Sequence, residues 1–345
     1  MADVFAYLEG FGVSGGSPNK STIIVTAPTG STVTCKMGST TKTAAEKNGV
    51  WTFGGLDLGT WTITSTKGGD SATQDVSITR LTVEYVTIVY RITPEFTYTG
   101  DYEIVDDSDS PISNFATWKS GWKIRFLTSG TFTVTNFYGW NGNLDVFLVG
   151  GGGGTKWTVG GKACGGGAGG GYTQTGKAIT VTTNTPYQID IGAGGIGAAD
   201  GGTTSAFGLS ASGGGHPISA DGAAGGSGGG GYIHANASGT SASGAGNGGS
   251  DGSDGVTAGS GGGDGGKGQG TTTREFGEEN GKLYAGGGAG ASNKGSVSPV
   301  GGAGGGGDTK SDGAINTGGG AGNALNGTHS GGSGIAIIRN AREAA

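Results

Sequence analysis

The stretch Val149-Gly150-Gly151-Gly152-Gly153-Gly154 opens a region, reaching residue 334, that is about one-third glycine and has no collagen register. Glycine has no side chain to bury and loses much backbone entropy on ordering, so such a region cannot build an ordinary core. An extended threefold helix suits glycine runs, because bare backbones can lie side by side and exchange N–H···O=C bonds. We therefore predict polyglycine II helices, packed in parallel and antiparallel rows, from about residue 150 to residue 334.

Composition limits the classes of function. The chain has 345 residues, 85 of them glycine, and a net charge of −6 with scattered cationic residues. The absence of a basic patch disfavours nucleic-acid binding. No apolar run reaches the length of a membrane span, and the N-terminus lacks a signal-peptide pattern, so we expect a chain that is not exported by a signal peptide and does not insert in a membrane. Cys35 and Cys164 are expected to be unpaired thiols.

The residues before the glycine-rich region predict β-structure. Residues 1–20 form a leader or attachment segment, and residues 21–91 contain short strands rich in β-branched residues, separated by turn signals. This rhythm predicts an antiparallel β-sandwich. The alternation of apolar and Thr or Ser residues predicts the side chains that face its core. These are Ile23, Val25, Val33, Trp51, Phe53, Trp61, Ile63, Val76 and Ile78.

A second small β-domain is predicted over residues 92–149, with strands near 102–105, 122–127, 131–134 and 144–149. Asn141-Gly142-Asn143 before the last of these strands is a hairpin signal. The glycine-rich domain, residues 150–345, ends in an apolar strand at 335–339. Because strands bracket the glycine-rich stretch, we expect the chain to leave one sheet and return to it. The predicted fold class is therefore all-β.

Motifs for catalysis and cofactors are weak. Gly192 to Gly197 match G-x-G-x-x-G after a predicted strand, but a turn sequence follows where a nucleotide-binding helix is required. Asp251 and Asp254 lack the recurring nine-residue period of a calcium-binding β-roll. The three histidines lie in separate loops without a neighbouring carboxylate or cysteine at ligand spacing. We expect no enzyme activity, no cofactor and no metal site.

Polar segments interrupt the glycine blocks and are predicted to be loops at the ends of a rigid bundle. Residues 232–246 and 271–285 are the longest of them, and they combine aromatic with hydrogen-bonding side chains. For Tyr232 and Phe276 two interpretations stay open, packing on the lattice and contact with a receptor. As receptor-binding residues we predict Tyr232, His234, Asn236, Arg274, Phe276 and Glu278.

Several stretches resemble glycine-rich tail proteins of bacteriophages and prophages of Gram-positive gut bacteria. They are Asp145 to Gly154, Gly169 to Thr173, Tyr187 to Gly195, Thr271 to Glu278, Leu283 to Gly288 and Gly334 to Arg339. Residues 22–86, with Gly59-Thr60-Trp61-Thr62-Ile63-Thr64, resemble immunoglobulin-like or carboxypeptidase-regulatory-like β-modules. The glycine-rich half is also similar, more loosely, to the tip adhesins of long tail fibres, although a coiled-coil or collagen shaft is missing.

The resemblance implies a non-enzymatic virion protein at the tail tip or fibre, made in the cytoplasm of a bacterial host. Its partners would be a host cell-surface glycan or protein and other tail or baseplate proteins, and assembly as a homo-oligomer, for example a trimer, is left open. The alternative is a purely structural tail, baseplate or filament subunit without receptor binding. A third class, an ice-binding polyglycine bundle, is disfavoured by the bulky side chains of Trp157, Tyr232 and Phe276, which do not suit a flat face of small residues.

Overall fold

The computed structural model describes residues 20–67, 70–88, 93–118, 120–138, 140–159, 162–163, 165–236, 239–242, 246–248, 254–256, 263–266, 272–291, 298–323 and 325–342. The chain divides into two compact units, Met1–Thr93 and Pro94–Ala345. Both units are built from β-strands, and the only helices among the described residues are two single 3-10 turns. The expected all-β class is confirmed. Neither helical turn is long enough to cross a membrane.

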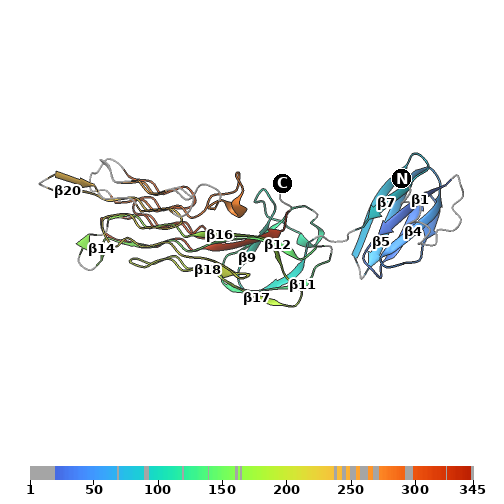
Figure 1. The fold of residues 1–345 in the computed structure, drawn as a ribbon, viewed down its shortest axis with the longest axis horizontal. Coiled ribbons are helices and arrows are strands. Elements are labelled where there is room, and N and C mark those ends of the chain that lie inside the picture. The colour runs from blue at the N-terminus through green and yellow to red at the C-terminus, as the bar shows by residue number, and fades with distance from the viewer. Residues whose placement is uncertain are drawn as a thin grey trace, which may run out of the picture. The chain divides into compact units, whose positions relative to one another are not determined.

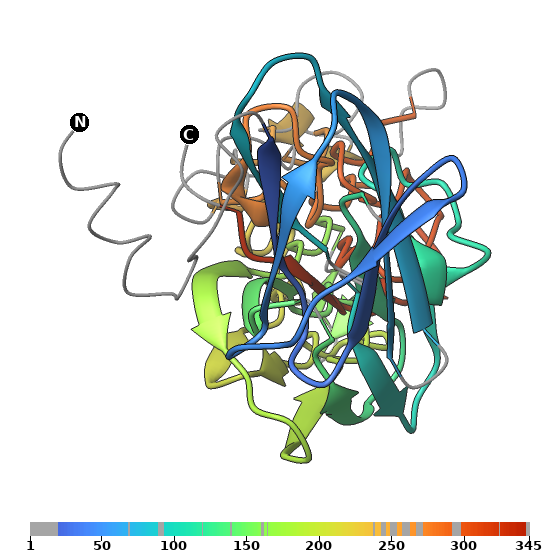
Figure 2. The same ribbon diagram turned by 90° about the vertical axis from the view of Figure 1, so that its right-hand side faces the viewer.

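The first unit is a sandwich of two sheets, drawn in blue in Figures 1 and 2. One sheet has the order β4-β1-β7 and the other the order β3-β2-β5-β6. The pairs are antiparallel, except that β1 and β7 run parallel. The strands are β1 (Ser21–Thr26), β2 (Thr32–Met37), β3 (Thr40–Thr43), β4 (Val50–Leu56), β5 (Gly59–Lys67), β6 (Asp70–Ile78) and β7 (Val83–Thr87).

The predicted alternation accounts for the core of this sandwich. Eight of the nine side chains predicted to face inward are buried, and Val76 is half-buried against them. Trp51, on β4, is 2% exposed and pairs with Val25 on β1. Cys35 lies in the same core as a free cysteine, and burial raises the pKa of its thiol to about 11. Cys164 lies outside the described residues.

The second unit contains two five-stranded sheets, with the orders β16-β12-β23-β10-β9 and β19-β18-β17-β11-β8. Their strands are β8 (Glu95–Tyr98), β9 (Tyr102–Val105), β10 (Lys123–Phe126), β11 (Gly130–Asn136), β12 (Asn143–Val149), β16 (Thr173–Thr180), β17 (Pro186–Asp190), β18 (Thr204–Ala206), β19 (Leu209–Ala211) and β23 (Ile335–Asn340). The shorter elements are η1 (Phe115–Thr117), β13 (Thr155–Lys156), β14 (Thr158–Val159), β15 (Lys162–Ala163), β20 (Ile233–Asn236), β21 (Gly239–Ala242), η2 (Glu275–Gly277) and β22 (Thr328–His329).

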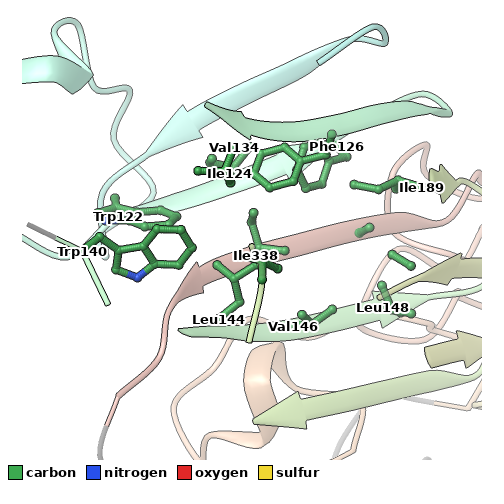
Figure 3. Close-up of a cluster of buried hydrophobic side chains, with 14 of the residues drawn as sticks. Trp122, Ile124, Phe126, Val134, Trp140, Leu144, Val146, Leu148, Ile189 and Ile338 are labelled. Carbon is green, nitrogen blue, oxygen red and sulfur yellow. The ribbon is translucent and has the colours of Figure 1, made fainter. Parts of the chain in front are cut away.

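The main core of the second unit lies between these two sheets, as Figure 3 shows. Side chains alternate along β12, so that Leu144, Val146 and Leu148 point into this core. The remaining positions of β12 and β23 face the opposite side of the sheet, where Phe147 and Ile337 belong to a second apolar cluster. The central strands of the first sheet, β10, β12 and β23, are therefore buried on both faces.

Residues 94–149 and the glycine-rich region share one unit, which differs from the two separate domains expected. The physical reason is strand pairing, since β12 lies between β16 and β23 and both of these belong to the glycine-rich part. The expectation that the chain leaves one sheet and returns to it is confirmed by the pairing of β12 with β23. The hairpin predicted at Asn141-Gly142-Asn143 is wrong. A hairpin would pair β11 with β12, but β12 pairs with β16 and β23, and β11 belongs to the other sheet.

The glycine runs bond to one another through their backbones. In the run 167–172, consecutive N–H groups donate to three different segments, and the same segment recurs at every third residue, with N···O distances of 2.8–3.0 Å. The pairs are Gly167 to Gly230, Ala168 to Ala321, Gly169 to Gly215, Gly170 to Ser227, Gly171 to Gly318 and Tyr172 to Ser212. In each of these three segments the residue number of the acceptor falls by three as that of the donor rises by three, so the segments run antiparallel to the run 167–172. In another pair of segments the acceptors advance with the donors, because Gly286 donates to Gly304 and Ala289 donates to Gly307. Neighbouring glycine segments therefore run both parallel and antiparallel to one another.

Close backbone approach explains why these positions are glycine. A Cβ atom placed on Gly167 would lie 2.1 Å from the carbonyl oxygen of Gly288, and one on Gly229 would lie 2.0 Å from that of Gly167. Such distances are far below van der Waals contact. Hydrogen bonds between backbones therefore take the place of side-chain burial in this part of the unit.

Candidate functional site

Residues 272–285, here called the cover segment, lie across the second face of the sheet β16-β12-β23-β10-β9. Phe276, in the turn η2, and Tyr284 are 2% and 1% exposed. Both rings pack on Phe147 of β12, with centroid distances of 6.1 and 5.4 Å. Phe276 adopts a φ of 56°, which is uncommon for a residue with a Cβ. The cover segment thus closes an apolar cluster that would otherwise leave the sheet face open.

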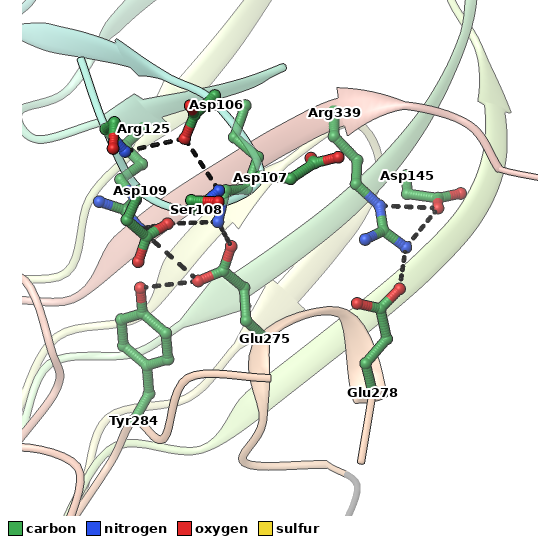
Figure 4. A network of polar contacts seen from close by, with 12 residues as sticks. Asp106, Asp107, Ser108, Asp109, Arg125, Asp145, Glu275, Glu278, Tyr284 and Arg339 are labelled. Atoms are coloured by element: carbon green, nitrogen blue, oxygen red, sulfur yellow. Dashed lines mark hydrogen bonds and ion pairs between the residues drawn. The ribbon is translucent and has the colours of Figure 1, made fainter. Parts of the chain in front are cut away.

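Beside this cluster, two cations of β10 meet the cover segment. Lys123 and Arg125 alternate with core residues and point to the same face as Phe147. The ammonium of Lys123 lies 2.8 Å from Glu275 Oε1 and also contacts Asp109, which forms an ion pair with Arg125. The hydroxyl of Tyr284 donates to Glu275 Oε2 at 3.2 Å. Figure 4 shows this network.

A second centre surrounds Arg339 of β23. Its Nε and Nη2 atoms donate to Oδ2 of Asp145 at 3.2 and 3.1 Å, and Nη2 also donates to Glu278 at 2.6 Å. Asp145 is 1% exposed and also accepts the N–H of Ala178 at 3.2 Å. The guanidinium stacks on Phe276, 4.1 Å from the ring centroid. Arg339 therefore joins β12, β23 and the cover segment.

The network shifts the pKa values of its acids. Burial would raise the pKa of Asp109, but hydrogen bonds from Arg125 and Lys123 outweigh it, so this pKa lies below its ordinary value. The hydrogen bond from Arg339 lowers the pKa of Glu278. Burial, reinforced by the Glu275 carboxylate, raises the pKa of Tyr284, so this hydroxyl stays protonated and donates to Glu275. Asp109 and Glu278 are therefore held in their charged form at neutral pH.

A cavity of 290 Å³ adjoins both centres and is lined by charged and polar side chains. Lys123, Glu275 and Arg339 form its buried wall, and Asn280 and Lys282 of the cover segment lie at its exposed side. Such an arrangement can hold a small polar ligand, because fixed charges are in place before the ligand arrives.

The structure separates the residues that the sequence predicted to act together. Arg274, Phe276 and Glu278 lie in the cover segment, where Arg274 donates to the carbonyl of Gly281 at 3.1 Å. Tyr232 is 2% exposed and meets the half-buried Trp157 edge-on at 5.3 Å.

His234 and Asn236 belong to strand β20, and nothing further is described of their side chains. Both predicted aromatic contacts are thus packed inside the chain. Their role in receptor binding stays a prediction, but neither ring offers an exposed apolar surface. The expectation that residues 271–285 form a loop at the end of the bundle is wrong, because residues 272–285 cover a sheet. Their apolar side chains complete a core that the glycine lattice cannot provide.

Sequence reasoning missed Lys123, Arg125, Asp145 and Arg339. A signal was present, because each of these charges lies in a strand and alternates with large apolar residues. Charges at the inward positions of a strand buried on both faces require partners. Glu275, a partner of Lys123, and Arg339, the partner of Asp145, lie more than 150 positions from them in the sequence and could not be assigned from it.

Three comparisons bear on this chain. The family model described as glycine-rich domain matches residues 127–341, which is more than half of the chain. The comparison with curated proteins finds no match. Among solved structures, the chain is similar to a DUF3823 family protein from Bacteroides ovatus at 11% identity, covering 58% of this chain and 99% of that one. The TM-score is 0.19, and this likeness carries no argument.

Proposed function

The chain belongs to the glycine-rich domain family, and from this premise we propose that it is a non-enzymatic bacteriophage tail protein whose bundle presents loops to a host cell surface. It would reside in the virion, at the tail tip or fibre, and contact other tail or baseplate proteins. Its ligand would be a cell-surface glycan or protein. The glycine runs would be polyglycine II helices, an assignment supported by hydrogen-bond partners that recur at every third residue.

The observation that carries this proposal is the location of the inserted segments. In Figure 1, β14 and β20 lie at the end of the second unit that is remote from β11, β12 and β17. The short hairpins β14–β15 and β20–β21 therefore extend beyond the glycine runs. A lattice held by its backbone tolerates sequence change only in such segments, because each interior glycine contacts a neighbouring backbone. A protein that recognises different receptors from one fixed scaffold needs its variable segments to be separate from that scaffold.

The burial of Tyr232 and Phe276 favours a second candidate, a structural tail or baseplate subunit without receptor binding. In that case the ends of the glycine bundle would contact other virion proteins instead of a host. The two candidates share a location in the particle and differ in what the bundle end contacts.

Location is tested first, by inducing the encoding phage or prophage, purifying particles and labelling this chain for electron microscopy. Label at the tip of the tail supports both candidates, whereas absence of the chain from particles contradicts both. Purified protein is then added to host cells. We expect binding by the parent and its loss when residues 233–242 are replaced by a short Gly-Ser turn. The matched control, Thr183→Ala in an exposed turn next to the sheets, should bind like the parent. Binding that survives the replacement would exclude the β20–β21 hairpin as the recognition site.

A further inference from the structure

We propose that the 290 Å³ cavity beside the cover segment is a binding site for the carboxylate of a monosaccharide-sized acid, such as a uronic acid. The carboxylate part of this inference is independent of the proposed function. The identification of the ligand as a sugar rests on that function, since a host surface glycan is its proposed partner.

The first observation is an unused donor on a buried arginine. The side chain of Arg339 is 3% exposed, and its Nε and Nη2 atoms are occupied by Asp145 and Glu278. Its Nη1 atom donates no hydrogen bond to any residue that the structure describes. Figure 4 shows this nitrogen turned away from Asp145, toward the side of the network that holds Glu275. Nη1 is therefore available to donate a hydrogen bond to an oxyanion in the cavity.

The second observation is that the acids around the cavity are already paired, whereas cationic donors remain. Asp109 and Glu275 contact Lys123, and Asp107 contacts Arg342. Lys282, an exposed residue of the cover segment, lies 5.4 Å from the ring centroid of Tyr284 and forms no ion pair with a described residue. The groups left for a ligand are therefore the ammonium of Lys282 and the Nη1 donor of Arg339, and both suit an anion better than a cation.

The third observation concerns size and the remaining lining. Nη1 of Arg339 offers a single nitrogen, because Nε and Nη2 are engaged, so the arginine contacts one oxygen of the anion and Lys282 is left for the other. Ser108 and Asn280 also line the cavity and carry neutral groups that suit hydroxyls. A cavity of 290 Å³ is larger than a bare oxyanion requires and admits one sugar ring. Together these features select a polyhydroxylated carboxylate.

Binding is tested on the full chain by isothermal titration calorimetry with three probes, sodium glucuronate, glucose and sodium sulfate. We expect a measurable Kd for glucuronate, no binding of glucose, and sulfate binding at least tenfold weaker. Lys282→Ala, an exposed position that should not affect folding, is expected to weaken glucuronate binding roughly threefold to tenfold. Arg339→Lys, checked by its melting temperature, should abolish binding while keeping a cation beside Asp145. The control, Lys156→Ala in β13, should bind like the parent.

Three outcomes would overturn the proposal. Sulfate that binds as tightly as glucuronate would reduce the cavity to a simple anion site, and glucose that binds equally well would exclude the carboxylate contact. Glucuronate affinity unchanged in both Lys282→Ala and folded Arg339→Lys would place binding elsewhere. Failure of the tail-tip location would not alter these titrations, so the two proposals fail separately.

Discussion

At the scale of single residues, glycine allows neighbouring backbones to approach closely, because it has no Cβ atom. The N–H of Gly229 bonds to Ala223, and its missing side chain allows the carbonyl of Gly167 to approach. Ala224, a few residues away, points outward and is exposed. The same backbone run therefore contains one position that excludes a Cβ and another whose Cβ belongs to an exposed residue.

Gly229→Val is expected to destabilise the second unit by about 3 kcal/mol or more, because a Cβ would lie 2.0 Å from the Gly167 oxygen. Thermal melts followed by circular dichroism measure the change. Ala224→Val serves as the matched control and should melt within a degree or two of the parent. Equal melting of both variants would contradict backbone-to-backbone packing.

Phe276→Ala is expected to cost about 3 kcal/mol of unfolding free energy, since this ring is 2% exposed and packs between Phe147 and the guanidinium of Arg339. Chemical denaturation gives the value, with the exposed neighbour Glu279→Ala as the control. A Phe276→Ala protein that retained full stability but lost binding to cells would restore the receptor-contact interpretation.

At the scale of elements, the cover segment is held to the sheet by charge as well as by apolar packing. Glu275 joins it to Lys123 of β10, and Glu278 joins it to Arg339 of β23. Removing one partner of such a buried pair leaves an unpaired charge, which is more costly than the pair itself is stabilising. The attachment of this segment should therefore depend on the ionisation of its acids.

The stability of the second unit should depend on pH through Asp109, whose folded-state pKa lies below the ordinary value because Arg125 and Lys123 bind its charged form. Its contribution is present above the unfolded pKa of about 3.9 and is lost as pH falls through the lower, folded value. Melting temperatures of the second unit should therefore decline below about pH 4. The melting temperature of Asp109→Asn should decline less steeply with falling pH than that of the parent. Asp101 is an exposed acid without an ion pair among the described residues, so Asp101→Asn should decline like the parent. Identical profiles for all three would contradict the role of Asp109.

At the scale of the whole molecule, each unit has its own core. The apolar cluster of the first unit draws only on residues 23–88, and those of the second only on residues after 95. The two cores are therefore expected to unfold as separate cooperative transitions.

Differential scanning calorimetry of the full chain should resolve these transitions. Trp61→Ala should lower one of them and Trp122→Ala the other, because each tryptophan is about 1% exposed in a different core. Each variant is the control for the other. A single transition that shifts in both variants would show that the units unfold together.

The sequence by itself determined the features that depend on neighbours along the chain. Alternation of apolar and Thr or Ser residues placed Trp51, Trp61 and Ile63 in the first core, because side chains of a strand point to opposite faces in turn. Glycine content determined that the second half would be held by its backbone. The apolar strand at 335–339 indicated the return to a sheet.

Only the tertiary structure decided which distant segments meet. Lys123 and Glu275, or Asp145 and Arg339, are more than 150 positions apart, and no local pattern pairs them. The same holds for Phe276, whose polar neighbours predicted an exposed loop. Phe276 and Tyr284 instead join the apolar cluster on the face of β12 and β23 that holds Phe147. Burial of that sheet face, and with it the charged cavity, arises from contacts that form only when the chain returns to its first sheet.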